Sequence, residues 1–213
     1  MRISGSGLRR LGFWTVAALA TAIALTSYRY LLPGPPFPAP GPLANRWTHL
    51  GVLTAHAAFA ATALLVGSFQ FVAAVRTNHP SIHRRLGTVY VFCALAGGVA
   101  GLALSTGVSS GPVAGAGFGL LALAWMATTF AAWRLARARD LVRHRRWMIR
   151  SFALCLAAVT LRLYLPLSQI AGLPFERAYA AIAWICWLPN LAIAELVLNW
   201  RGMFARPAAP RPV

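Results

Sequence analysis

Long apolar runs alternate along the chain with short segments that are rich in arginine or proline. The six apolar runs lie near residues 12–32, 47–74, 86–106, 113–135, 147–169 and 178–200. About 20 helical residues cross a hydrocarbon core of about 30 Å, so each run is long enough to span a bilayer. The runs are continuously apolar, whereas strands of membrane barrels alternate over about ten residues. The pattern therefore predicts an all-α fold, a polytopic transmembrane bundle of six helices.

Arginines indicate the orientation of this bundle. With the N-terminus inside, the inner segments carry sixteen arginines and the outer segments carry only Arg29, Arg46 and Arg177, while Arg162 falls within a helix. Basic residues collect on the cytoplasmic side of membrane proteins. We therefore expect both termini in the cytoplasm and a location in the bacterial inner (plasma) membrane.

The polar segments divide the chain into three parts. Residues 1–46 are expected to hold the first helix and a stiff outer linker, PGPPFPAPGP at 33–42, because prolines favour extended polyproline geometry. Residues 47–200 form a five-helix membrane domain, and 201–213 a disordered basic tail whose arginines can meet anionic lipid. The basic start resembles a signal peptide, but the long apolar run without a clear cleavage site favours an uncleaved helix.

Composition excludes some functions. Of the residues, 59% are hydrophobic and 11% are charged, against about 25% charged in soluble domains. The net charge of +17 comes entirely from arginine clusters between apolar runs, which is the pattern of membrane topology and not of nucleic-acid binding. The cysteines Cys93, Cys155 and Cys186 lie within apolar runs without a CxxC partner, so we interpret them as small core residues.

A weak internal repeat links two inner segments. His83 and His144 each open a His-Arg-Arg triplet, each follows an arginine by seven residues, and each precedes an apolar run that carries a cysteine. This arrangement suggests two related helical hairpins of the same orientation. Repetition of basic triplets at inner loops is the competing explanation.

Two sets of glycines have the spacing of close helix contacts. Gly97 and Gly101 form a GxxxG motif, and Gly111, Gly115 and Gly119 continue the same spacing at the start of the fourth run. They could serve a homo-oligomer or a membrane partner, but we favour tight packing between the third and fourth helices. Pro189 removes a hydrogen bond to the Ile185 carbonyl and is expected to kink the sixth helix.

His83 and His144 are the candidate cofactor ligands. A b-type haem needs two imidazoles from two helices at one depth, and both histidines lie where an inner loop enters a helix. Arg84 and Arg145 would then suit the haem propionates. His56 is a weaker candidate, because its neighbour His49 lies seven residues away on the same helix and cannot face it across a ring. The alternative for the pair is two interfacial cations.

Other polar residues within the membrane also need a reason, because their burial is expensive. His56 and Arg162 lie at comparable depth and could share a site, although Arg162 could instead snorkel to the outer interface. Arg150 and Glu195 are expected to form a structural ion pair. The remaining buried polar candidates are Gln70 and Asn190. Motifs of soluble enzymes are absent, and three acids in all leave little room for carboxylate chemistry.

Four stretches carry a family resemblance: HRRLGTVYVF (83–92), HRRWMIRSFAL (144–154), LRLYLP (161–166) and AWICWLPNLAIAELVL (183–198). Over roughly residues 48–200 they resemble an uncharacterised family of bacterial multi-pass membrane proteins, a domain of unknown function with HRxxG and HRRWMIRS motifs. The resemblance implies recurring polar positions at His56, Gln70, Arg76, His83, Arg84, Gly87, His144, Arg145, Arg150, Arg162, Asn190 and Glu195. By analogy, the helix count and histidines look like those of the cytochrome b561 and ferric-reductase group.

Three functions are compatible with these patterns. The first is a haem-binding redox or electron-transfer protein that uses His83 and His144. The second is a small transporter or sensor with a polar site around His56, Arg162 and the kink at Pro189. The third is an assembly partner of another membrane complex that docks through the glycine faces. We place the redox function first, because histidine is scarce here yet stands at equivalent helix starts.

Overall fold

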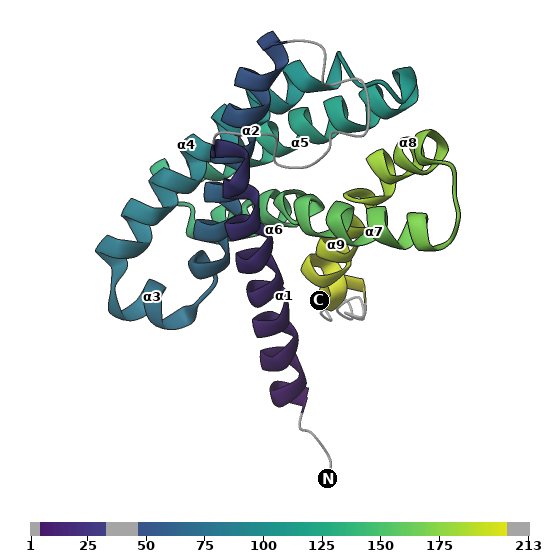
Figure 1. Ribbon diagram of the computed structural model, residues 1–213. Coiled ribbons are helices and arrows are strands. Elements are labelled where there is room, and N and C mark those ends of the chain that lie inside the picture. The colour runs from purple at the N-terminus through teal and green to yellow at the C-terminus, as the bar shows by residue number, and fades with distance from the viewer. Residues whose placement is uncertain (1–4, 33–46, 204–213) are drawn as a thin grey trace, which may run out of the picture.

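The computed structural model describes residues 5–32 and 47–203, and all regular structure within them is helical (Figure 1). The predicted linker at 33–42 and residues 204–213 of the predicted tail lie outside the described residues, whereas residues 201–203 of that tail are helical. The elements are α1 (Gly5–Ser27), η1 (Tyr28–Leu31), α2 (Trp47–Gln70), α3 (Ala73–Asn78), α4 (Pro80–Ser105), α5 (Gly111–Arg137), α6 (Leu141–Cys155), α7 (Ala157–Ile170), α8 (Phe175–Ile185) and α9 (Leu188–Met203).

Six stretches of these helices are long and apolar enough to cross a membrane. They are Leu11–Leu31, Gly51–Gln70, Pro80–Ser105, Gly111–Arg137, Leu141–Ile170 and Phe175–Asn199. The predicted all-α, six-span architecture is therefore confirmed, while the side of the membrane on which each end lies stays a prediction. We call the end of the bundle that holds α3 and the α5–α6 turn the basic end, since most arginines were expected there.

Two spans begin about six residues earlier than the hydropathy pattern predicted, and local chemistry explains both starts. Pro80 occupies the first turn of α4, where its missing N–H costs no hydrogen bond. Asp140 caps α6 by accepting hydrogen bonds from the Arg143 backbone N–H at 3.0 Å and from its guanidinium at 2.5 Å. These hydrogen bonds lower the pKa of the Asp140 carboxyl below its ordinary value. A proline in the first turn of α4 and a polar cap on α6 thus favour a helix start ahead of each apolar run.

The fifth and sixth spans are each built from two helices. The break between α6 and α7 lies at Leu156, and the break between α8 and α9 lies at Cys186 and Trp187, where the two helices meet at an angle (Figure 1). Pro189 explains the second break, as predicted, because it cannot donate to the Ile185 carbonyl. The first break was not predicted.

Polar side chains join the two broken spans where they meet. The Thr160 hydroxyl of α7 donates to the Cys186 carbonyl, and the Asn190 amide donates to the same carbonyl at 3.0 Å and to the Thr160 hydroxyl at 3.3 Å. Backbone groups at a helix break need partners inside a membrane. Asn190, expected as a buried polar residue, therefore satisfies the broken backbone of its own helix.

The glycine motifs pack against two different helices. A Cβ on Gly97 would lie 3.2 Å from the Ala60 backbone nitrogen of α2, and one on Gly101 would lie 3.0 Å from the His56 ring. On α5, a Cβ on Gly115 would lie 2.7 Å from the Ser105 carbonyl oxygen. The predicted packing between the third and fourth spans, α4 and α5, is thus present at Gly115 and, similarly, at Gly119. The GxxxG motif of α4, in contrast, packs against α2. A role of these glycines in oligomers stays a prediction.

The core lies where α2, α4, α5 and α6 pack together. At its centre the fully buried Tyr90 hydroxyl shares a hydrogen bond of 2.8 Å with Ser151, and Ser151 shares one of 2.6 Å with Thr129. Trp125 donates to the Tyr90 hydroxyl at 3.5 Å. Each hydroxyl is therefore satisfied, as buried polar groups require, and the chain of bonds ties α4, α5 and α6 to one another.

Candidate functional site

His83 and His144 occupy equivalent places in the fold. Each is the fourth residue of its helix, α4 or α6. The His83 backbone N–H donates to the His79 carbonyl at 3.0 Å, and the His144 N–H donates to the Asp140 carbonyl at 2.9 Å, so each closes the first turn of its helix on the N-cap residue. This correspondence agrees with the internal repeat expected from the sequence.

The structure places these two histidines within electrostatic range of each other. They lie close enough for their imidazoles to interact electrostatically, although 61 residues separate them in the chain. Seven residues further along each helix, Tyr90 and Ser151 share their hydrogen bond of 2.8 Å. That bond fixes α4 against α6 two turns beyond the histidines and so limits how far the two imidazoles can separate.

Each imidazole is held through its Nδ1 atom. His144 Nδ1 lies 2.8 Å from the Ala132 carbonyl oxygen of α5, so this nitrogen must donate and the neutral ring carries its lone pair on Nε2. His83 Nδ1 lies 2.8 Å from the side-chain amide of Gln70, at the end of α2. Among the described residues, both rings form hydrogen bonds through Nδ1 only, and Nε2 of each ring has no protein partner there.

The orientation of the Gln70 amide determines the tautomer of His83, that is, which ring nitrogen carries the proton of the neutral imidazole. All its contacts are satisfied when the amide nitrogen donates to Nδ1 and, at 3.3 Å, to the His83 carbonyl, while the amide oxygen accepts from the Gly87 N–H at 3.2 Å. In that orientation the neutral His83 ring carries its proton on Nε2. The site then presents one N–H donor, on His83, and one lone-pair acceptor, on His144.

Arginines surround this pair. Arg84 and Arg145 immediately follow the two histidines, and their side chains are exposed. Arg76 and Arg84 lie close enough to His83 to interact with it electrostatically. The site is therefore strongly cationic at its rim and would attract negatively charged groups of a ligand.

His56 lies at a second site, away from the basic end. Its Nδ1 is 2.8 Å from the Gly97 carbonyl oxygen of α4, and the ring packs against Gly101. Arg162 lies within electrostatic range of this ring, so the two residues do share a region as the sequence suggested. No second histidine accompanies His56 there among the described side chains. Its neighbour His49 on α2 is outside the described side chains.

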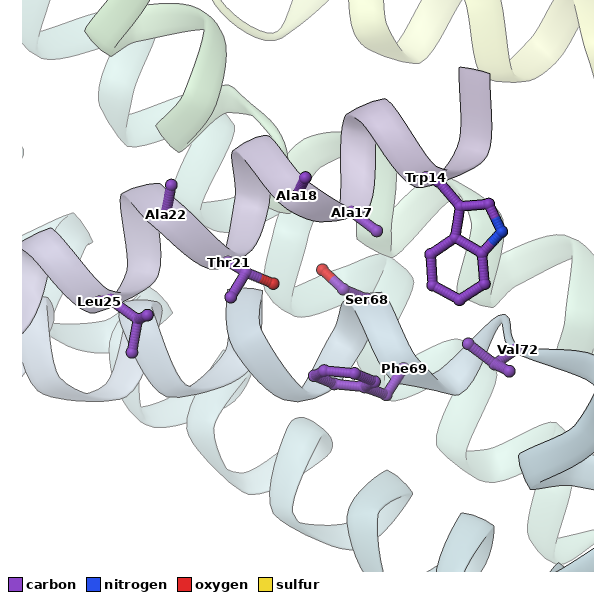
Figure 2. A pocket seen from close by; sticks show the side chains of 9 residues that line it. All are labelled: Trp14, Ala17, Ala18, Thr21, Ala22, Leu25, Ser68, Phe69 and Val72. Carbon is purple, nitrogen blue, oxygen red and sulfur yellow. The ribbon is translucent and has the colours of Figure 1, made fainter. Parts of the chain in front are cut away.

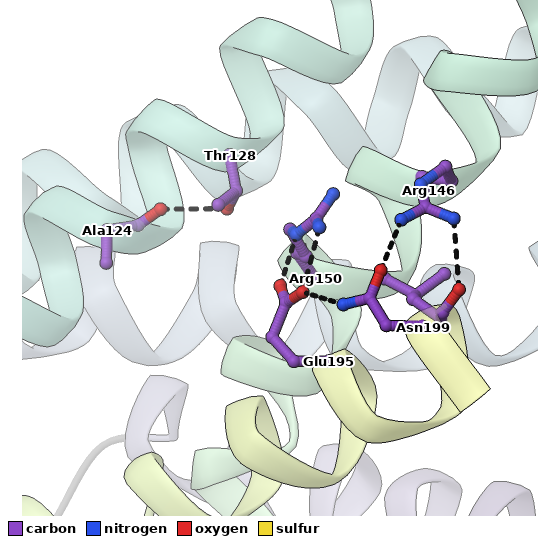
Figure 3. Close-up of polar contacts among 7 residues, drawn as sticks. Ala124, Thr128, Arg146, Arg150, Glu195 and Asn199 are labelled. Atoms are coloured by element: carbon purple, nitrogen blue, oxygen red, sulfur yellow. Dashed lines mark hydrogen bonds and ion pairs between the residues drawn. The ribbon is translucent and has the colours of Figure 1, made fainter. Parts of the chain in front are cut away.

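The predicted ion pair between Arg150 and Glu195 is present in the structure (Figure 3). The guanidinium donates to both carboxylate oxygens, with Nη2 to Oε2 at 2.9 Å, and stacks 4.9 Å from the centre of the Trp147 ring. One turn before Arg150, Arg146 donates to the Leu198 carbonyl at 3.0 Å, near the C-terminal end of α9. These contacts join α6 to α9 and indicate a structural role.

A groove on the outside of the bundle lies between α1 and α2 (Figure 2). Its volume is about 400 Å³, and its lining includes Trp14, Leu25 and Phe69. The only side-chain hydroxyls in its lining belong to Thr21 and Ser68. A groove without a titratable group suits a lipid chain and offers no acid–base or ligating chemistry.

Six long apolar helical spans define this protein as a polytopic helical membrane protein. Residues 53–198 match the family described as "Predicted membrane protein (DUF2306)", and the chain belongs to that family. The match covers both histidine segments but assigns them no role. None of the curated proteins and none of the solved structures that were compared matches the chain. The analogy to cytochrome b561 and ferric reductases therefore finds no support in these comparisons.

Proposed function

We propose that this protein binds one b-type haem through His83 and His144 and serves in one-electron transfer at the membrane. The observation that supports the proposal is the placement of these imidazoles within electrostatic range of each other, at equivalent positions of α4 and α6, with each ring bonded to the protein through Nδ1. Haem iron changes its oxidation state by one electron, and axial imidazoles help to set its potential.

Two imidazoles are a more suitable set of protein ligands for haem than for a bare metal ion. Within the described residues, no group of three or more His, Cys, Asp or Glu side chains is arranged to hold a metal. A protein-bound zinc ion takes three or four protein ligands. Haem brings four nitrogen ligands of its own and needs only the axial positions from the protein. Two imidazoles therefore suffice for haem where they fall short for a bare ion.

The surroundings of the two rings also suit this ligand. Ligating histidines usually donate their second N–H to a carbonyl, as His144 does to Ala132. His83 would need the same tautomer, with Nδ1–H donating to the Gln70 amide oxygen, so ligation requires the amide to turn over. The exposed guanidinium groups of Arg84 and Arg145 can bind propionate carboxylates in a bidentate manner.

Absorbance spectroscopy tests the proposal directly. We expect protein purified from cells supplied with haem precursors to show a reduced-minus-oxidised b-type spectrum, and His83→Ala and His144→Ala each to lose most of it. His79→Ala is the matched control, because His79 is exposed at the same end of α4 and should leave the spectrum intact. A flat wild-type spectrum without bound iron would reject haem and leave the transporter and assembly functions. A spectrum that survives both substitutions would instead point to His56.

Gln70 offers a second test that leaves both histidines in place. We expect Gln70→Leu to weaken haem affinity roughly 10- to 100-fold, because the turned amide, whose oxygen would accept from Nδ1–H of His83, is lost, and such partners orient a ligating histidine. Haem content is measured by titration of the apoprotein. Gln169→Leu serves as the control, since Gln169 is exposed near the far end of α7. Equal affinities of the two variants would show that the contact between Gln70 and His83 does not support a ligand.

A further inference from the structure

Arg162 is a partly buried cation of α7 in the half of the bundle opposite the basic end. Its guanidinium donates to the Ala158 carbonyl at 3.0 Å and to the Ser27 hydroxyl at 2.9 Å. Guanidinium stays charged under all physiological conditions and carries five N–H donors. Two neutral oxygens therefore satisfy only part of its hydrogen-bonding capacity and none of its charge.

The chain has no carboxylate side chain left for Arg162. It contains only three acidic residues, Asp140, Glu176 and Glu195. Asp140 pairs with Arg143 and Glu195 pairs with Arg150. Glu176 is exposed in the first turn of α8, and it forms no ion pair among the described residues. Compensation of the Arg162 charge must therefore come from outside these side chains.

The direction of the Arg162 side chain follows from the geometry of its helix. Helical side chains lean toward the N-terminus of their helix, and the N-terminus of α7 lies near the middle of its span. The bond to Ala158, one turn deeper, shows that the guanidinium follows this direction. The other acceptor, Ser27, lies four residues before the end of the first span, so the alternative expected from the sequence, an arginine extended to the outer interface, stays a prediction.

The groups around Arg162 are suited to an anion. Tyr30 of η1 and Tyr179 of α8 both lie within electrostatic range of the guanidinium, and both are partly buried. The Tyr179 ring is held by Phe118 and Phe175, each with its centroid 5.3 Å away. His56 approaches from α2. Phenol hydroxyls donate to oxyanions readily, and His56 can do the same from Nε2 when protonated.

From this arrangement we infer a binding site for an oxyanion, a carboxylate or phosphate group, held by Arg162 with the hydroxyls of Tyr30 and Tyr179. The anion forms charge-assisted hydrogen bonds with the guanidinium, which are the strong kind and which offset the cost of a charge inside the membrane. Its source is either the headgroup of a phospholipid or a soluble solute. The inference is independent of the proposed haem site, since the two share no residue.

Ligand-dependent thermal stability tests for the solute. Protein purified in a maltoside detergent, which carries no phosphate, is heated with increasing phosphate or acetate against chloride at constant ionic strength. We expect the wild-type midpoint to rise with the oxyanion, and Arg162→Gln to weaken its affinity at least about tenfold. Arg177→Gln is the matched control, because Arg177 is exposed in the first turns of α8 and lies outside the proposed site.

Native mass spectrometry of the same samples tests for a lipid headgroup. Phospholipid retained by wild type and by Arg177→Gln, but lost from Arg162→Gln, would assign the site to a headgroup even if no solute binds. Tyr179→Phe removes one hydroxyl and serves as the second probe in case Arg162→Gln does not accumulate. If solute affinity and retained phospholipid are the same in wild type, Arg162→Gln and Tyr179→Phe, the inference is overturned, whatever the haem spectrum shows.

Discussion

Replacement of either Arg150 or Glu195 by leucine is expected to lower the free energy of unfolding by roughly 2–3 kcal/mol. Breaking a fully buried ion pair costs about 3–5 kcal/mol, because one charge is left without compensation. The Arg150 side chain is 17% exposed and that of Glu195 is 38% exposed, so the surroundings relieve part of this cost. Without Arg150, the Glu195 carboxylate keeps the hydrogen bond from Asn199 at 3.1 Å, and without Glu195, the Arg150 guanidinium keeps its contact with the Trp147 ring. Each of these contacts compensates only a minor part of the remaining charge.

The double variant separates pairing from packing. With both residues replaced by leucine, no charge remains uncompensated, so we expect a loss well below the sum of the two single losses. The measurement is unfolding in mixed micelles that contain an increasing fraction of denaturing detergent. Asp140→Asn provides a comparison at an exposed pair, because asparagine keeps the cap of α6 and removes only the charge, and its effect should be far smaller. Additive losses at Arg150 and Glu195 would contradict the coupling.

Much of the fold could be predicted because a bilayer leaves few choices. Continuous apolar runs of about 20 residues have no stable alternative to helices in lipid. Pro189 cannot donate a backbone hydrogen bond to the Ile185 carbonyl and so interrupts its helix. The break at Leu156 could not be predicted, because no proline or glycine marks it. The Thr160 hydroxyl, one turn after the break, reaches the Cys186 carbonyl across a contact between two spans that only the tertiary structure defines.

For the two histidines, the sequence could predict a common depth in the membrane and equivalent positions in a repeat, but not that they approach each other. Both residues start helices at the same end of the bundle, but the approach of α4 to α6 across the core depends on how α2 and α5 pack against both of them. The sequence singled out Gln70 as a costly polar residue, yet nothing in it connects this amide to His83. The hydrogen bond of Tyr90 with Ser151 was missed entirely, although the repeat places both residues seven positions after a histidine.

A glycine of α2 outside the GxxxG motifs, Gly67, packs against that buried contact. A Cβ at this position would lie 2.7 Å from Cε2 of Phe152 and 2.8 Å from Cε2 of Tyr90, closer than real Cβ atoms approach other atoms. Neither ring can easily withdraw. Tyr90 is fully buried and bonded to Ser151, while Phe152 packs 5.2 Å from the Phe71 ring.

We therefore expect Gly67→Ala to destabilise the protein by about 2–3 kcal/mol, at the upper end of the usual cost of an added methyl group in a packed core. Gly51→Ala is the matched control in the same helix: nothing lies within 4 Å of its Cβ, so alanine should gain up to about 1 kcal/mol from helix propensity. Unfolding in mixed micelles measures both.

Relief of the clash identifies its cause. Phe152→Leu replaces the ring that lies nearest to Gly67 with a shorter side chain. Gly67→Ala should therefore lower the free energy of unfolding less in that background than in wild type. Because Tyr90 and Phe152 lie on the helices that carry His83 and His144, a displaced ring would also disturb the spacing of the two imidazoles, and Gly67→Ala should lower haem content where Gly51→Ala does not. Equal stability of the two alanine variants would show that α2, α4 and α6 do not pack as closely as Gly67 allows.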